Sequence, residues 1–197
     1  TWDYFPLTVE LIWNDPCRDQ FALPADAPVN YEVFLAGLHP DDRARADAAV
    51  IEALDPHGTG HINIEFRSIG FTDCVERWLI STGRAKFELG RAVRFTGTTV
   101  DITERKRAEE QLAEAHRFLH SAIDALSSHV AVLNEHGVIL TVNEAWRRFA
   151  DENQYDGHNY GVGSNYVEEC EHTSSDCLEG DTVGQGLLAV LRGERQE

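Results

Sequence analysis

Residues 97–112 read Gly97-Thr98-Thr99-Val100-Asp101-Ile102-Thr103-Glu104-Arg105-Lys106-Arg107-Ala108-Glu109-Glu110-Gln111-Leu112. Apolar and polar residues alternate from Val93 into this stretch, which predicts a strand with one apolar face. Asp101 precedes Glu104 by three residues, a spacing typical of a helix N-cap with a capping-box partner that stabilises the helix start by roughly 1 kcal/mol. The stretch therefore predicts a strand that runs straight into a charged helix at the end of a domain.

The predicted helix carries a heptad pattern. Its apolar residues alternate in steps of four and three: Ala108, Leu112, Ala115, Leu119, Ala122 and Leu126. Most other positions are charged or polar, so two interpretations are open. The helix lies on its own domain, or it pairs with its twin in a parallel dimer. We expect a homodimer whose contacts are made by Leu112, Ala115, Leu119, Ala122 and Leu126. The seam spans under three heptads and is marginal alone.

Composition limits the classes of function. The 197 residues suffice for one large or two small domains, and no apolar run approaches the length of a membrane span. The chain begins at Thr1 without a signal pattern, and its four cysteines are scattered without C-x-x-C spacing. We therefore expect a fragment of a longer cytoplasmic protein with free thiols and no membrane segment.

The net charge of −17 disfavours nucleic acid and anionic lipid as partners. The sequence also has no recognisable nucleophile–base pair, phosphate-binding glycine loop or nucleotide-binding kinase core. We therefore expect no catalytic module within this chain and no nucleic-acid partner.

The first hundred residues predict an α+β domain. The expected strands occupy residues 2–14 as a pair, then 62–66, 75–82 and 92–100. The expected helices occupy residues 17–23, 31–38 after a capping Asn30, and 40–54 with a proline in the first turn. This order predicts an antiparallel sheet with helices on one face.

After residue 127 a similar pattern begins again. Strands are expected at 130–133 and 138–142 around a turn at Asn134–Gly137, followed by a helix at 144–152 that Asn143 caps and a later helix at 183–191. The second unit has no segments equivalent to the last three strands expected in the first unit.

This double pattern resembles the PAS sensory domain family. In the first unit the likeness is carried by FALPADAP (21–28), YEVFLAGLHPDDRARADAAVIEAL (31–54), INIEFRSI (62–69), RWLISTGRA (77–85) and VRFTGTTVDITERKRAEEQL (93–112). In the second it is carried by HVAVLNEHGVILTVNEAWRRFADEN (129–153), GSNYVEEC (163–170) and GLLAVLRGE (186–194). The resemblance implies a five-stranded antiparallel sheet with helices over one face, often with a ligand cavity between them.

The resemblance also implies a division of the chain and a role. Residues 1–100 would form a PAS domain, 101–127 a signalling linker helix, and 128–197 the N-terminal part of a second PAS domain without its last three strands. The function implied is signal relay to a downstream output module, as in sensor histidine kinases or diguanylate cyclases. We expect Asp101, Ile102 and Thr103 to act as the hinge. The alternative is a PAS-type dimerisation module with no small-molecule ligand.

Two groups of residues suggest metal ligands. Cys170, His172 and Cys177 supply three of the four ligands that zinc prefers, with His158 as a possible fourth; the other interpretation is a buried cysteine and a solvated histidine. His116 and His120 have a known metal-pair spacing on the linker helix, but we interpret them as solvated side chains.

The cofactor remains unknown from the sequence. Residues 44–54 contain no cysteine for a flavin adduct, whereas Trp13, Asn14 and Trp78 are candidates to line a cavity for noncovalent flavin. His39 is a candidate axial ligand for haem, but the Pro40 that follows it favours a role at the helix start. We expect no tightly bound cofactor.

Overall fold

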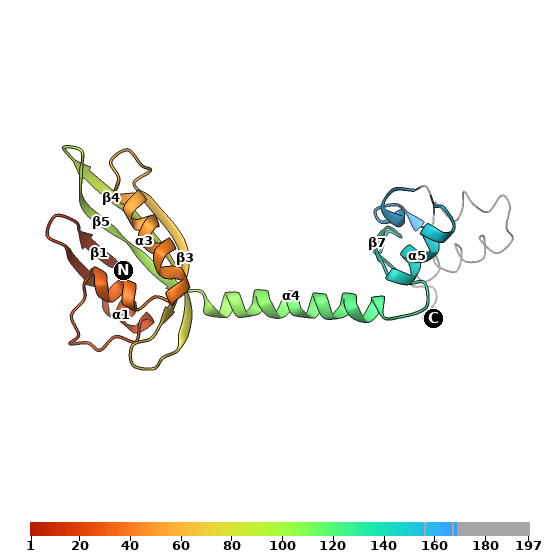
Figure 1. Cartoon of the computed structure of the whole chain (residues 1–197), viewed down its shortest axis with the longest axis horizontal. Helices are drawn as coiled ribbons and strands as arrows, with labels where there is room; N and C mark the ends of the chain where they lie inside the picture. Colours follow the sequence, from red (N-terminus) through yellow and green to blue (C-terminus); the bar gives the residue numbers. More distant parts are fainter. Residues whose placement is uncertain (156, 167, 169–197) are drawn as a thin grey trace. The chain divides into compact units, whose positions relative to one another are not determined.

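The computed structural model describes residues 1–155, 157–166 and 168 (Figure 1). Contacts divide the chain into two compact units, Thr1–Gln111 and a second unit from Leu112 onward. Helix α4 (Thr103–Asp124) therefore begins in the first unit and ends in the second. No helix in the described part of the chain is both long and apolar enough to span a bilayer.

The first unit is an α+β domain around one five-stranded sheet in the order β2-β1-β5-β4-β3, with every neighbouring pair antiparallel. Its elements are β1 (Trp2–Phe5), β2 (Glu10–Trp13), α1 (Asp15–Gln20), α2 (Tyr31–Ala36), α3 (Pro40–Leu54), β3 (His61–Ile69), β4 (Glu76–Glu88) and β5 (Arg91–Asp101). Helices α1 and α3 lie on one face of the sheet (Figure 1). The predicted fold class is confirmed.

Side-chain caps decide where the three helices begin. Asn14 accepts a hydrogen bond from the backbone N–H of Cys17 at 3.2 Å, so α1 starts at Asp15, two residues before the predicted start. Asn30 caps α2 as predicted. At α3, the Nδ1 atom of His39 accepts from the N–H of Asp41 at 3.3 Å, which confirms the role of this histidine at the helix start.

Strand β4 is longer than predicted, because it continues to Glu88 rather than ending at Thr82. Gly83 and the charged residues after it obscure the alternation in the sequence, yet the ladder to β5 holds them extended up to the turn at Leu89 and Gly90. Leu79, Ser81 and Ala85 form the buried face of this strand.

Two glycines of the sheet make room for the indole of Trp2. Gly83 and Gly97 are directly paired on β4 and β5, and a Cβ atom at Gly83 would lie 2.5 Å from the Trp2 ring. Trp2 also packs edge-on against Phe95, with ring centroids 4.8 Å apart. The glycine pair thus lets the first strand place an aromatic ring on the core face.

Gly83→Ala is therefore expected to displace Trp2 and to lower the free energy of unfolding by about 1–3 kcal/mol, since overpacking a filled core forces neighbours to shift. Chemical denaturation of the whole chain measures this effect. Thr98→Ala on the exposed face of β5 is the control and should cost under about 1 kcal/mol. Equal stabilities of the two variants would contradict the close packing.

The described part of the second unit holds β6 (Ala131–Leu133), β7 (Ile139–Val142), α5 (Glu144–Glu152) and the short 3-10 helix η1 (His158–Gly161). The two strands pair antiparallel around the predicted turn, with Gly137 at φ 79°. Asn143 caps α5 at the predicted residue. The helix expected at 183–191 and the region of the closing strands lie outside the described residues.

Candidate functional site

The join between β5 and α4 is fastened to strand β4 by two hydrogen bonds of the Trp78 backbone, one through its carbonyl and one through its N–H. The N–H of Ile102 donates to the Trp78 carbonyl at 2.8 Å, and the N–H of Trp78 donates to the Thr103 hydroxyl at 3.0 Å. The Ile102 side chain is buried. One residue of β4 therefore holds together the residue that follows β5 and the first residue of α4.

The cap of α4 differs in detail from the predicted capping box. Asp101 is the last residue of β5, and its Oδ1 atom accepts from the N–H of Thr103 at 2.8 Å. The first helical bond runs from the N–H of Lys106 to the carbonyl of Ile102 at 2.9 Å, so Ile102 occupies the N-cap position. In the described structure Glu104 makes no return bond to Asp101, because the strand ladder places that residue outside the helix.

Ion pairs hold the first turn of α4 against β3. Glu65 accepts from Arg105 at 2.6 Å and from Lys106 at 2.7 Å. Hydrogen bonds from Lys106 and Arg105 lower the pKa of the Glu65 carboxyl. The Lys106 ammonium also lies 5.1 Å from the centre of the Trp78 ring, within cation–π range. Charge contacts thus reinforce the backbone contacts of the join.

A second set of contacts ties α3 to the same tryptophan. Asp42 is 7% exposed and accepts from the Arg67 guanidinium at 2.9 and 3.1 Å and from the Arg67 N–H at 2.9 Å. The Arg67 hydrogen bonds lower the pKa of Asp42 to about 2. The same guanidinium lies 5.6 Å from the centre of the Trp78 ring. A contiguous series of contacts therefore joins α3, β3, β4 and α4.

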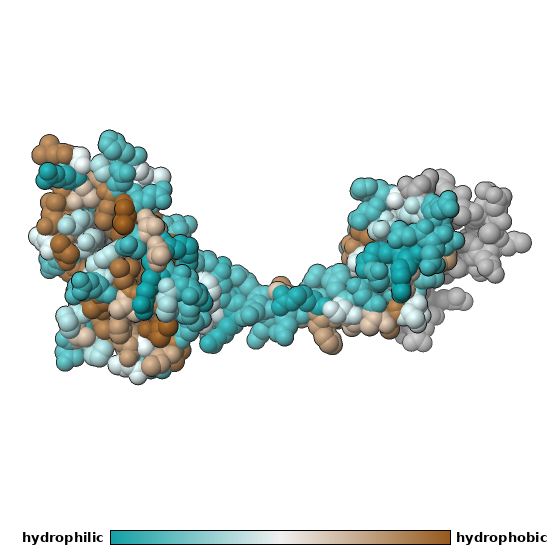
Figure 2. Space-filling view, viewed as in Figure 1, coloured by the Kyte–Doolittle hydropathy of each residue, from teal (hydrophilic) through white to brown (hydrophobic). Residues whose placement is uncertain are grey.

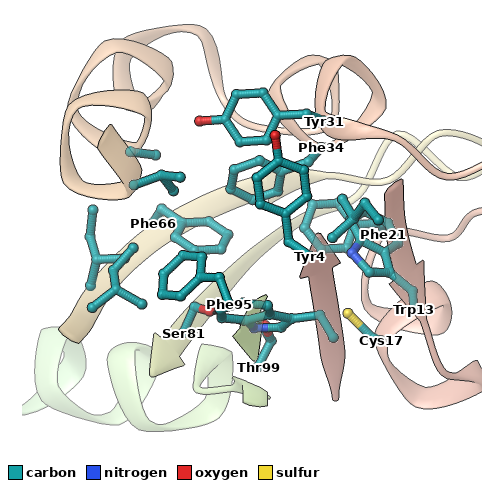
Figure 3. Close-up of a pocket in the computed structure, with 16 residues that line it drawn as sticks. Tyr4, Trp13, Cys17, Phe21, Tyr31, Phe34, Phe66, Ser81, Phe95 and Thr99 are labelled. Carbon is teal, nitrogen blue, oxygen red and sulfur yellow. Dashed lines mark hydrogen bonds between the residues drawn. The ribbon is translucent and has the colours of Figure 1, made fainter. Parts of the chain in front are cut away.

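A cavity of about 50 Å³ lies between the helices and the sheet of the first unit (Figure 3). Its walls are mostly aromatic and aliphatic: Trp2, Tyr4, Leu11, Trp13, Cys17, Phe21, Tyr31, Phe34, Ala46, Val50, Ile62, Ile64, Phe66, Ser81, Phe95 and Thr99. Pockets for drug-sized ligands occupy roughly 300–1,000 Å³. In this conformation the cavity is therefore too small for haem or flavin.

The residues suggested for those cofactors are also dispersed. Trp13 lines the cavity, but Asn14 is used as the cap of α1. Trp78 lies on the opposite face of β4 from Leu79 and Ser81, so this candidate does not line the cavity. His39 caps α3 and is not part of the cavity lining. The residues suggested for haem or flavin are therefore not gathered around this cavity.

Polar groups in the cavity connect it to β5. The indole N–H of Trp2 donates to the Ser81 hydroxyl at 3.0 Å, and the Thr99 hydroxyl lies 3.3 Å from the same oxygen. Gln20 donates to the Thr99 carbonyl at 3.0 Å. Burial raises the pKa of the nearby Cys17 thiol to about 11, so this thiol is neutral near pH 7. Thr99 is two residues before Asp101, which places the cavity wall next to the join.

The other end of α4 is fastened by Asn143, which is fully buried. Its Oδ1 atom accepts from the N–H groups of Val130 at 2.9 Å and Trp146 at 3.0 Å. Its amide nitrogen lies within 3.2 Å of the carbonyls of Ile123, Leu126 and Ser128. The sequence indicated a helix cap here, but not a residue that links α4 to α5.

Between its ends α4 has an exposed apolar face. Leu112 is 73% exposed, Phe118 70% and Leu119 58%. The surface of the helix is otherwise largely hydrophilic (Figure 2). Leu126 lies two residues beyond the end of α4, so the last position of the predicted seam is not helical.

In the described part of the chain no three His, Cys, Asp or Glu residues are close enough to share a metal ion. His116 and His120 lie side by side on α4, with ring centroids 4.5 Å apart. Cys170, His172 and Cys177, the suggested zinc ligands, lie outside the described residues.

Comparison with known proteins gives relatives among sensor proteins. Sensor protein FixL from Bradyrhizobium diazoefficiens is 30% identical over 148 residues, which cover 75% of this chain and 29% of the relative. The probable diguanylate cyclase DgcE from Escherichia coli is 23% identical over 122 residues, 62% of this chain and 11% of the relative. The chain therefore spans less than a third of either relative.

One solved structure that aligns with this chain is the N-terminal domain of a diguanylate cyclase with PAS/PAC sensor from Marinobacter aquaeolei. It has a TM-score of 0.48 and 13% identity, covering 53% of this chain and 95% of that chain. No protein-family model matches the sequence. The first unit has the antiparallel five-stranded sheet with helices on one face that the sequence motifs implied, and the likeness to a sensor protein extends over three quarters of the chain. These findings support a PAS-type sensor domain in the first unit.

Proposed function

We propose that this chain is the sensory and relay region of a cytoplasmic signal-transduction protein. The PAS domain at 1–100 receives a ligand or partner, and the linker at 101–127 passes the change to a second PAS unit and on to an output module. The two relatives, a sensor protein and a probable diguanylate cyclase, support a sensory role. Their greater length supports an output module elsewhere in the parent protein.

The observation that carries the proposal is the double attachment of Trp78 to the join. Strands β4 and β5 are paired in one ladder, and Trp78 of β4 bonds to both Ile102 and Thr103. A shift of either strand must therefore move the first turn of α4 or break these hydrogen bonds. Glu65 and its two cations extend the attachment along the helix. The relay we propose is a tilt or rotation of α4 at Asp101, Ile102 and Thr103.

The exposed apolar face of α4 supports a homodimer through the linker. Leu112 and Leu119 are exposed and one heptad apart, as expected for one core position of a parallel coiled coil. A relay would then act on the crossing angle or register of two helices.

The cavity favours a second candidate function. A volume of about 50 Å³ leaves the interior largely filled by side chains, as in a domain that dimerises or binds a partner without a small-molecule ligand. Native mass spectrometry of the purified chain separates the two candidates, since a co-purified ligand supports the sensory domain and a ligand-free dimer supports the interaction module.

The experiment for the relay is Asp101→Ala in the full-length parent protein. This change removes the carboxylate that accepts from the Thr103 N–H, but leaves the strand ladder in place. We expect the output activity to lose its dependence on the first domain, while circular dichroism of that domain stays unchanged. A response equal to that of the wild type would refute the hinge.

A further inference from the structure

The outer edge of strand β3 has a gap in its hydrogen bonding. β3 is an edge strand, and in an antiparallel ladder alternate residues direct their backbone groups away from the neighbouring strand. Arg67 and Ile69 face outward, because the Arg67 carbonyl accepts from His39 at 2.9 Å and the Ile69 N–H donates to Gly37 at 2.8 Å. By the same alternation, Asn63 and Glu65 also face the free edge.

The chain covers most of this edge itself. The Arg67 N–H donates to Asp42, the Glu65 carbonyl accepts from Arg45 at 2.8 Å, and the His61 N–H donates to the Thr59 hydroxyl at 3.2 Å. Within the described residues, the N–H and C=O of Asn63 and the N–H of Glu65 have no hydrogen-bond partner. The uncovered groups form one short site for strand pairing.

A groove of about 370 Å³ runs along this gap, which is within the range of ligand-binding clefts. One wall is the α3 face that carries Arg45, Ala48, Ala49 and Glu52, and the other is residues 61–64 of β3. Ile62 and Ile64 border the groove but are only 8% and 9% exposed, whereas the small side chains of Ala48 and Ala49 leave space on the helix side. The groove thus combines free backbone groups with the small apolar side chains of α3.

The charges of the groove indicate what kind of peptide fits. Arg45 is engaged by Asp42 at 3.6 Å and by the Glu65 carbonyl, whereas Glu52 has no cationic partner among the described residues. The net charge of the chain is −17, which attracts basic partners and repels acidic ones. The unused charge in the groove is therefore negative.

We propose that this groove binds an extended peptide segment of a partner protein, which adds a short strand to β3 at Asn63 and places a Lys or Arg side chain near Glu52. Backbone hydrogen bonds to the edge supply affinity in this mode, and side-chain pockets supply specificity. The site is separate from the join, and it does not depend on the proposed relay.

The test is selection of random heptapeptides displayed on phage against the whole chain, followed by titration with the enriched synthetic peptides. We expect enriched sequences with alternating β-branched residues and a Lys or Arg. Their binding should shift the amide NMR signals of Asn63 and Glu65. Glu52→Gln should weaken binding roughly fivefold, since one partly exposed charge pair is lost.

Ala48→Arg fills the groove and adds a repelling charge, so it should weaken binding at least about tenfold. Ala44→Arg is the matched control, because Ala44 is exposed on the same helix and does not line the groove. The proposal is overturned if no peptide is enriched, if binding survives Ala48→Arg, or if Ala44→Arg weakens binding equally. It is also overturned if Ala48→Arg abolishes self-association of the chain, which would make a second copy the occupant.

Discussion

Asn143→Ala is expected to lower the stability of the second unit by about 3 kcal/mol, because it removes the cap of α5 and leaves buried backbone groups without partners. The side chain bonds to residues at the end of α4, at the start of β6 and in the first turn of α5, so its loss loosens all three. Hydrogen exchange at residues 131–133 and 144–152 measures the effect.

Asn153→Ala provides the matched control at the other end of α5. Asn153 is exposed, and its side chain donates only to the Phe149 carbonyl at 2.8 Å. We expect a change within about 0.5 kcal/mol, as for most surface substitutions. If Asn143→Ala leaves exchange as slow as this control does, Asn143 does not link the end of α4 to α5.

Asp42→Asn is expected to lower the free energy of unfolding by about 2 kcal/mol at neutral pH, because it removes a buried carboxylate with a pKa of about 2. The lowered pKa means that the stabilisation is present above about pH 4, the unfolded value, and disappears as pH falls towards 2. Denaturant unfolding of wild type and variant between pH 7 and pH 2.5 measures the difference.

The sign of this pH dependence distinguishes the ion pair from simple packing. The difference between wild type and Asp42→Asn should shrink as the solution becomes acidic. Asp41→Asn is the neighbouring control, since Asp41 is exposed and lies 3.6 Å from Arg67. It should cost under about 1 kcal/mol. A pH-independent loss at Asp42 would show that its charge is not what stabilises the fold.

Local signals in the sequence predicted much of the fold. The bounds of α3 and the start of α5 agree with the prediction, because Pro40 and Asn143 act on the residues next to them. The end of β4 was missed, since Gly83 and the charged residues after it are held extended by ladders to other strands. The predicted heptad seam extends to Leu126, but helix α4 ends at Asp124.

The site was harder to predict because its residues are distant in sequence. Asp101, Ile102 and Thr103 could be proposed from the strand–helix boundary alone. Glu65 and Trp78 could not, since nothing in their own segments indicates contact with α4. Trp78 was a candidate for the cavity wall, yet the pleat of β4 places it on the opposite face, where the cations of Arg67 and Lys106 lie over its ring. The volume of the cavity depends on the packing of side chains from eight elements.

The proposed relay requires that a change on the inner face of the sheet reaches α4. Ser81 is buried, bonds to Trp2 and Thr99, and has no hydrogen bond to α4 in the described structure. Ser81→Ala leaves the Trp2 N–H and the Thr99 hydroxyl without this partner, and should loosen β5. Asn63→Ala on the exposed face of β3 is the control.

Hydrogen exchange of the amides at residues 105–112 in these variants tests the relay most directly. We predict faster exchange in Ser81→Ala than in the wild type or in Asn63→Ala, because the join transmits the loosening of β5 to the first turns of α4. Faster exchange in β5 with unchanged exchange at 105–112 would contradict transmission through Asp101, Ile102 and Thr103.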